Sequence, residues 1–151
     1  MEQTAVLRGN APARIDDKGR LKIPTAFKAV VEAKHGRDLF VTSLTGESVR
    51  IYPMPVWIEI ERRLAQIPTT HPARVRYFSR VNYYGQAAEL DNQGRVLIHG
   101  RLRESAGMTG EVDVFGQYDH LEVWNHERFV TKLASDPVTD ADARALAEFG
   151  I

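Results

Sequence analysis

Two short polar segments of this chain contain the same residues at the same spacing, and in both an arginine follows a glycine. Residues 14–24 read RIDDKGRLKIP and residues 89–99 read ELDNQGRVLIH, which share the pattern Asp-x-x-Gly-Arg. A guanidinium fixed beside a tight turn is a rigid donor that suits a phosphate group or the edge of a guanine base. The repeated arginine therefore indicates a candidate group for binding a nucleic acid.

The aspartate and the glycine of each segment predict the turn itself. Asp16 and Asp91 can accept hydrogen bonds from backbone N–H groups two or three residues further on. Gly19 and Gly94 can adopt the positive φ of a type I turn with a bulge. We therefore assign a turn-shaping role to Asp16, Asp91 and Gly94.

The arginine leaves two interpretations open. It could be structural, either as an ion pair with Asp16 across the turn or as a plain surface charge. Alternatively, Lys18, Arg20 and Lys22 project from a stiff hairpin as donors to phosphates and base edges, because a two-stranded β ribbon can enter a major groove.

The two segments differ in their other cations. Arg8 and Arg14 lie near the first turn, whereas Gln93 and Leu97 stand where the first copy has its two lysines. If the turns bind DNA, we expect the first one to dominate and Arg95 to be the equivalent donor in the second.

The elements that must position these turns are also duplicated. A shift of 75 positions aligns the two segments and continues to Phe27 and Leu102, and Tyr52 and Trp124 close the two copies in matching places. Each copy predicts a strand, the turn, a strand, a short helix and a hairpin whose turn contains Gly46 or Gly116. Further helices are expected in residues 55–67, 72–85 and 125–134, and the last residues could form a helical turn or two.

The fold class that follows is α+β. A unit of about fifty residues cannot bury much apolar surface alone, so the two copies are expected to share one core with approximate twofold symmetry. We predict a small β-barrel-like core of interleaved hairpins with helices at its sides.

Composition narrows the class of protein. The net charge is zero and there is no cysteine, so no disulfide framework or thiolate metal site is expected. With no signal peptide or membrane span in the sequence, we expect a cytoplasmic protein without a membrane partner. No motif predicts catalytic residues, a cofactor, a small-molecule substrate or a metal site. His120 and His126, with Asp119 and Glu122, do not form a metal-ligand pattern, because they straddle a strand and the start of a helix.

The charge is unevenly distributed along the chain. Residues 62–88 contain five arginines and no acid, whereas the last sixteen residues contain four acids and Arg144 alone. Local basic and acidic surfaces can exist on a protein of zero net charge. The following arginines form a secondary DNA-binding candidate, with solvated helix faces or interface salt bridges as the alternative: Arg62, Arg63, Arg76 and Arg80.

Taken together, four segments resemble the MraZ family. They read LRGNAPARIDDKGRLKIPTAFK, IYPMPVWIEIERRL, AAELDNQGRVLIHGRLRESAG and VDVFGQYDHLEVWNHERF, and they extend in order over roughly residues 7–130. The resemblance implies two tandem SpoVT/AbrB-like swapped-hairpin modules, at 8–55 and 84–127. Residues 56–83 would then be connecting helices, and residues 128–151 a C-terminal helix and an acidic tail.

The same resemblance implies a function. It points to a bacterial transcriptional regulator, usually a repressor, of the division and cell-wall gene cluster that contains its own gene. Such a protein would associate with the nucleoid and bind repeated promoter boxes of double-stranded DNA as a ring-like homo-oligomer. The family's DNA-contacting motif falls on Lys18, Gly19 and Arg20, with Asp16 shaping the turn and Arg95 as the second arginine.

Two departures from the family pattern and one alternative function accompany this interpretation. The N-terminus is a few residues longer than the usual start, and His99 stands where the first copy has Pro24, so the second helix could begin differently. The alternative is a structural, ring-forming protein-interaction module that makes no direct contact with DNA.

Overall fold

The computed structural model describes residues 6–151, and its elements occur twice in the same order. The first copy contains β1 (Asn10–Ile15), β2 (Arg20–Lys22), α1 (Thr25–His35), β3 (Asp38–Thr42) and β4 (Val49–Pro53). The second copy contains β5 (Gln86–Glu89), β6 (Arg95–Leu97), α4 (Gly100–Ser105), β7 (Gly110–Gly116) and β8 (Leu121–Asn125). The predicted order of strand, turn, strand, helix and hairpin is therefore confirmed for both copies.

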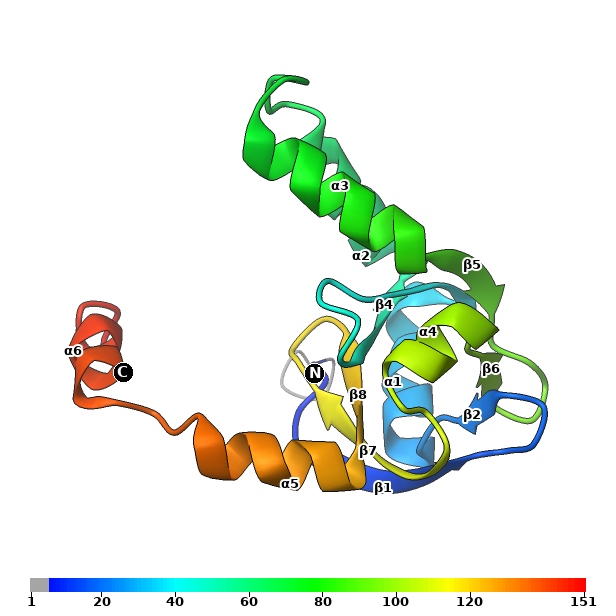
Figure 1. The fold of residues 1–151 in the computed structure, drawn as a ribbon. Coiled ribbons are helices and arrows are strands. Elements are labelled where there is room, and N and C mark those ends of the chain that lie inside the picture. Colours follow the sequence, from blue (N-terminus) through cyan, green and yellow to red (C-terminus); the bar gives the residue numbers. More distant parts are fainter. Residues whose placement is uncertain (1–5) are drawn as a thin grey trace.

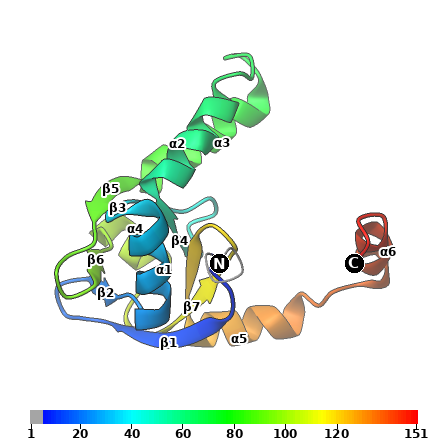
Figure 2. The same cartoon turned by 180° about the vertical axis from the view of Figure 1, so that it is seen from behind.

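Within residues 6–151, four further helices lie outside the two copies. They are α2 (Met54–Leu64) and α3 (Pro72–Tyr84) between the copies, and α5 (His126–Ser135) and α6 (Asp140–Ala147) after them. In Figure 1, α2 and α3 form an arm that projects from the body, while α5 leads away to α6, which stands apart. The view from behind shows the same separation (Figure 2).

The strands of the two copies exchange partners. All eight belong to one sheet in the order β5-β3-β4-β8-β7-β1-β2-β6. The first strand of each copy pairs with the hairpin of the other copy, because β1 lies against β7 and β5 lies against β3. The sheet curls into a nearly closed barrel, which confirms the prediction of interleaved hairpins in one α+β core.

The strand registers show the approximate twofold symmetry. Ala13 lies opposite Val112, and its equivalent Ala88 lies opposite Leu39. The symmetry axis passes through two pairs of equivalent strands: β2 with β6, and β4 with β8. A fold made in this way needs both copies, since each supplies sheet neighbours that the other lacks.

Alternation along these strands fills the core. Leu21 and Val96 face each other across β2 and β6, and at most 1% of either residue is exposed. On α1 the buried residue Phe27 packs into this core, and Leu102 on α4 occupies the equivalent position. The two helices begin at equivalent residues, so His99 in place of Pro24 does not move the start of α4.

The arm has a small core of its own. Trp57 of α2 stacks on Phe40 with ring centroids 4.7 Å apart, and it packs with Tyr52 and Val81. On the outer face, Arg63 forms an ion pair with Glu59, at 3.5 Å. The apolar side chains of α2 therefore pack mainly against α3 and against strands β3 and β4.

One predicted turn is wrong. Gly116 is the last residue of β7 and does not lie in the β7–β8 turn. A side chain at Gly116 would collide with the backbone of Leu7 and Arg8, which runs alongside. Glycine is needed there because two stretches of backbone approach closely.

Candidate nucleic-acid interface

The first repeated turn is held by its own aspartate. The carboxylate of Asp16 accepts hydrogen bonds from the backbone N–H groups of Lys18, at 3.0 Å, and Arg20, at 2.8 Å. Gly19 has a φ of +83°, and its N–H donates to the carbonyl of Asp16 at 3.0 Å. The pattern Asp-x-x-Gly-Arg therefore specifies one defined backbone shape.

The second turn repeats this geometry. Asp91 accepts from the N–H groups of Gln93, at 2.8 Å, and Arg95, at 2.9 Å. Gly94 has a φ of +75°, and its N–H donates to the carbonyl of Asp91 at 3.0 Å. Replacing lysine by glutamine at the turn tip leaves the backbone unchanged, because the bonds involve only the main chain at that position.

Each arginine is tied to the aspartate of its own turn. Nε of Arg20 donates to Oδ2 of Asp16 at 2.8 Å, and Nε of Arg95 donates to Oδ2 of Asp91 at 2.9 Å. The backbone N–H of the same arginine is the main cause that lowers the pKa of each aspartate, and the guanidinium lowers it further. Both carboxylates are therefore ionised at neutral pH.

This ion pair leaves most of each guanidinium free. The side chains of Arg20 and Arg95 are 30% and 25% exposed, and the described part of the chain offers their terminal nitrogens no hydrogen-bond acceptor. A guanidinium has five N–H donors, and only the one on Nε is used here. The aspartate thus orients the arginine while its outer fork remains available to a ligand.

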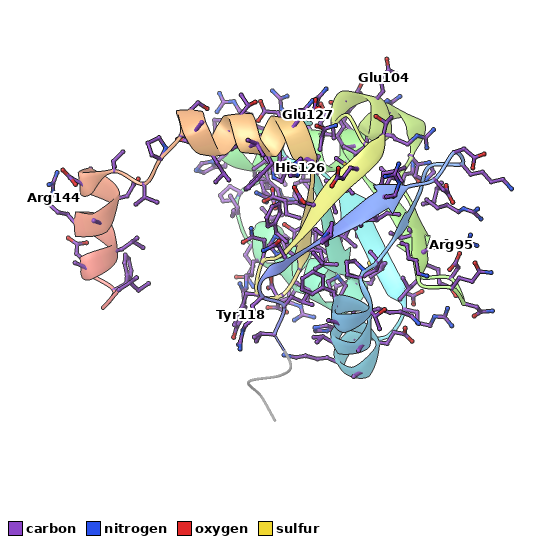
Figure 3. All side chains as sticks on the ribbon, turned by 90° about the horizontal axis from the view of Figure 1, so that it is seen from below. Arg95, Glu104, Tyr118, His126, Glu127 and Arg144 are labelled. Atoms are coloured by element: carbon purple, nitrogen blue, oxygen red, sulfur yellow. The ribbon has the colours of Figure 1, made fainter. Side chains whose placement is uncertain are left out.

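The two turns bring their cations onto one surface. In the β2–β6 pair, Leu21 lies opposite Val96 and both point inward. Their neighbours alternate to the outside, and this surface, the β2–β6 face, carries Arg20, Lys22, Arg95 and Leu97. Arg95 is at the end of the molecule opposite α6 (Figure 3).

Two further cations adjoin this face, and they were not among the predicted site residues. Arg103 of α4 lies against Gly19, where an added Cβ would be 2.7 Å from its Cζ, and its Nη1 donates to the carbonyl of Ile98 at 2.7 Å. Lys28 of α1 lies against Gly94, where an added Cβ would be 3.0 Å from its Cδ. Each helix thus places a cation over the turn of the other copy.

A signal for these two residues exists in the sequence. Lys28 and Arg103 are related by the same shift of 75 positions as the two turns, one residue after the aligned pair Phe27 and Leu102. The interleaved topology decides which turn each one meets, and that information is absent from the alignment.

The structure does not bring every candidate cation to this face. Arg8 precedes β1 at the end far from the turn, and six strand residues separate them by roughly 20 Å. Arg14 is exposed and lies opposite Glu111 of β7 in the register. Lys18 is exposed at the tip of the first turn, close to Arg20 in the chain.

His120 and His126 each pair with a different aspartate. Nδ1 of His120 is 2.9 Å from Asp119, and Nδ1 of His126 is 2.7 Å from Asp113, not Glu122. Over residues 6–151, no group of three or more His, Asp or Glu side chains could hold a metal ion. None of the helices described there has the length and apolar character needed to cross a membrane.

Comparison with known proteins places the chain in a family. Residues 85–149 match the family model described as "MraZ protein, putative antitoxin-like". A transcriptional regulator MraZ of Acidobacterium capsulatum is 49% identical over 97% of this chain and all of its own length.

Two more relatives carry the same name. The protein of Koribacter versatilis is 45% identical over 97% of this chain and its own full length. That of Syntrophobacter fumaroxidans is 40% identical over 78% of each chain. At these identities and this coverage, the chain belongs to the MraZ family.

Proposed function

We propose that this chain is a transcriptional regulator that binds double-stranded DNA through the β2–β6 face. The observation that carries the proposal is the outward row of Arg20, Lys22 and Arg95, whose arginines are pre-oriented by aspartates. The names of the relatives support the same role, because each is called a transcriptional regulator.

The geometry suits the major groove. A two-stranded ribbon can enter it, and a guanidinium fork can bind two acceptors of a guanine or a phosphate. Because Asp16 fixes the side chain of Arg20 before binding, less conformational entropy is lost when DNA is bound. Lys28 and Arg103, at the ends of the face, would contact the phosphates on either side.

The finer function is also a proposal. We infer a repressor of the division and cell-wall gene cluster that includes the protein's own gene, associated with the nucleoid and acting on repeated promoter boxes. A ring-like homo-oligomer explains how a chain of zero net charge binds firmly, because several identical faces on one assembly raise the effective concentration at adjacent boxes.

The test compares Arg20→Ala with Arg95→Ala. We expect Arg20→Ala to weaken binding to the DNA upstream of the protein's own gene by about 10- to 100-fold, as for loss of a bidentate base contact. Arg95→Ala should have a smaller effect, because Leu97 and Gln93 replace lysines around it. Binding is measured by fluorescence anisotropy at several salt concentrations.

Lys132→Ala is the matched control, since Lys132 is exposed on α5 and lies outside the β2–β6 face. Its affinity for the same DNA should equal that of the unmodified protein. Equal binding by all three variants would refute a role of the β2–β6 face in DNA recognition.

One observation favours a second function. Both arginines pair with an aspartate of their own turn, which a purely structural, ring-forming interaction module would also require. In that case Arg20→Ala would change the unfolding midpoint or the oligomer mass. Under the DNA-binding proposal the fold and the mass stay the same and only DNA affinity falls.

A further inference from the structure

The C-terminal helix α6 keeps its shape with its own residues. At its start, Oγ1 of Thr139 accepts from the N–H of Asp142 at 3.1 Å, and the carboxylate of Asp142 accepts from the N–H of Thr139 at 2.9 Å. At its end, Gly150 has a φ of +81°, and the N–H of Ile151 donates to the carbonyl of Leu146 at 3.1 Å. Helices of this length are marginal in water, and capping both ends compensates for that.

This capped helix covers nothing in its own chain. Every residue from Thr131 to Ile151 is exposed, and α6 stands apart from the body in both views (Figures 1 and 2). Phe149 and Ile151 are 79% and 82% exposed, and Leu146 is 40% exposed. A cluster of large apolar side chains at the end of a preformed helix is typical of a surface that binds a partner.

The arm carries a groove of complementary character. Its volume is roughly 480 Å³, and it lies between the β3–β4 turn and α3, lined by Leu44, Thr45, Ala73, Arg76, Tyr77 and Arg80. Leu44 and Tyr77 are half-buried and give it an apolar floor. Arg76 and Arg80 are exposed one helical turn apart, and within residues 6–151 neither forms an ion pair or a side-chain hydrogen bond.

The charges of helix and groove are opposite. The last sixteen residues carry Asp136, Asp140, Asp142 and Glu148 against Arg144, while residues 62–88 contain arginines and no acid. Opposite charges favour encounter and fix the orientation of two surfaces. The apolar side chains of α6 then supply the contact area that charge alone does not provide.

We propose that α6 of one copy docks into the arm groove of a second copy of this chain. Leu146 and Phe149 pack on the floor formed by Leu44 and Tyr77, and the acids of the tail face Arg76 and Arg80. Because α5 carries α6 away from the body, the helix is presented outward and meets another molecule. Little conformational entropy is lost when α6 binds, because the helix is already formed.

The proposed contact is head-to-tail. Donor helix and acceptor groove are different surfaces, so every copy offers one of each, and the contact repeats until it closes into a ring. The inference deepens the proposed function, because it rests on the homo-oligomer proposed above and identifies its contact surface. It also assigns Arg76 and Arg80 to an interface between copies in place of DNA binding.

The absence of cysteine allows a direct test by site-specific cross-linking. Ala145→Cys, one helical turn before Phe149 on α6, is introduced into a chain with one tag and Thr45→Cys into a chain with another, and the two are co-expressed and mildly oxidised. We expect a disulfide-linked dimer that carries both tags. Tyr118→Cys, which is 71% exposed at a different place (Figure 3), replaces Ala145→Cys as the control and should give none.

Two outcomes of this experiment overturn the proposal. One is the absence of a mixed-tag dimer. The other appears when both substitutions are placed in one chain: a disulfide that forms only within that chain would show that α6 covers its own arm.

A charge reversal separates this inference from the proposed function. Arg76→Glu with Arg80→Glu should reduce the oligomer mass measured by sedimentation, and Asp140→Lys with Glu148→Lys in the same chain should restore it. Leu146→Ser with Phe149→Ser should reduce the mass similarly without affecting the fold, since α6 covers nothing.

If the variant with Arg76→Glu and Arg80→Glu keeps the oligomer mass and the DNA affinity of the unmodified protein, the docking proposal fails while the proposed function stands. If it keeps its mass and loses DNA affinity, Arg76 and Arg80 belong to a DNA-binding surface and the proposal fails as well. Failure of the β2–β6 variants to alter DNA binding would instead refute the proposed function and leave the cross-link unaffected.

Discussion

The two repeated turns have the same backbone and carry different side chains. Asp16 and Asp91 accept the same main-chain hydrogen bonds, and both turn glycines have positive φ. Around them the cations differ, because Lys18 and Lys22 correspond to Gln93 and Leu97. The comparison teaches that the shape of the turn depends on a few residues, which leaves its outward side chains free to differ in what they recognise.

The largest expected effect concerns the core behind the turns. Leu21→Ala should lower the free energy of unfolding by about 2–5 kcal/mol, because the side chain is fully buried and leaves a cavity. Val96→Ala at the equivalent position removes a smaller side chain and should cost less, on the order of 1.5 kcal/mol for two methyl groups. Urea unfolding measures the stability of both variants. Equal losses would contradict the expectation that the cost follows the size of the side chain removed.

The second effect concerns the cations. Gln93→Lys with Leu97→Lys makes the second turn resemble the first, and we expect DNA affinity to rise roughly tenfold at low salt. The slope of log affinity against log salt should steepen by up to about 2, since each new phosphate contact contributes about 0.9.

The reciprocal change, Lys18→Gln with Lys22→Leu, should lower the affinity and flatten the slope by similar amounts. Lys132→Gln on α5 serves as the control and should change neither quantity. An unchanged slope in both turn variants would show that these positions do not approach phosphates.

The third effect concerns the glycines. Gly19→Ala and Gly94→Ala should each cost about 1–2 kcal/mol of stability, because alanine is strained at positive φ. Gly19→Ala should cost more, since its methyl group also displaces Arg103 from the carbonyl of Ile98, whereas Lys28 beside Gly94 is flexible.

A double-mutant cycle with Arg103→Ala isolates that extra cost. The additional destabilisation of Gly19→Ala should disappear in the Arg103→Ala background. If it persists there, the contact between Arg103 and Gly19 does not account for the difference between the two turns.

The smallest effect concerns pH, and here the two copies should behave alike. The pKa of Asp16 and that of Asp91 both lie below the ordinary value of 3.8, chiefly because the N–H of the following arginine donates to each carboxylate. A lowered pKa stabilises the fold above pH 3.8, and this contribution is lost as the pH falls through the lowered values.

Asp16→Asn and Asp91→Asn should therefore each reduce the dependence of the urea midpoint on pH below about 4, by similar amounts. A clear difference between the two variants would show that the aspartates are not equivalent.

Much of the fold could be predicted because the duplication is visible in the sequence. The matching of Asp16 with Asp91 fixes the turns, and the apolar alternation around Leu21 and Val96 fixes which face of each strand is buried. The need of two small units for a shared core then predicts interleaving. These inferences rest on local chemistry that each segment carries by itself.

What could not be predicted depends on where elements meet. Helical periodicity places Val56, Ile60 and Leu64 on one apolar stripe, but it does not show that Trp57 of the same helix packs on Phe40 and Val81 to build an arm. Lys28 and Arg103 join the site only because each helix passes over the turn of the other copy. The DNA-binding roles of Lys18, Gly19, Arg20, Lys22, Arg8 and Arg95 remain predictions for the experiments above.

The pairing of β1 with β7 and of β3 with β5 limits which assemblies the two copies can form. Two separate half-length polypeptides with these interlocking edges could pair like with like or like with unlike, giving three species. Covalent fusion through α2 and α3 leaves a single product with fixed stoichiometry. Every molecule then presents one lysine-bearing turn beside one lysine-poor turn. A ligand whose two halves differ therefore meets the two turns in the same order on every molecule.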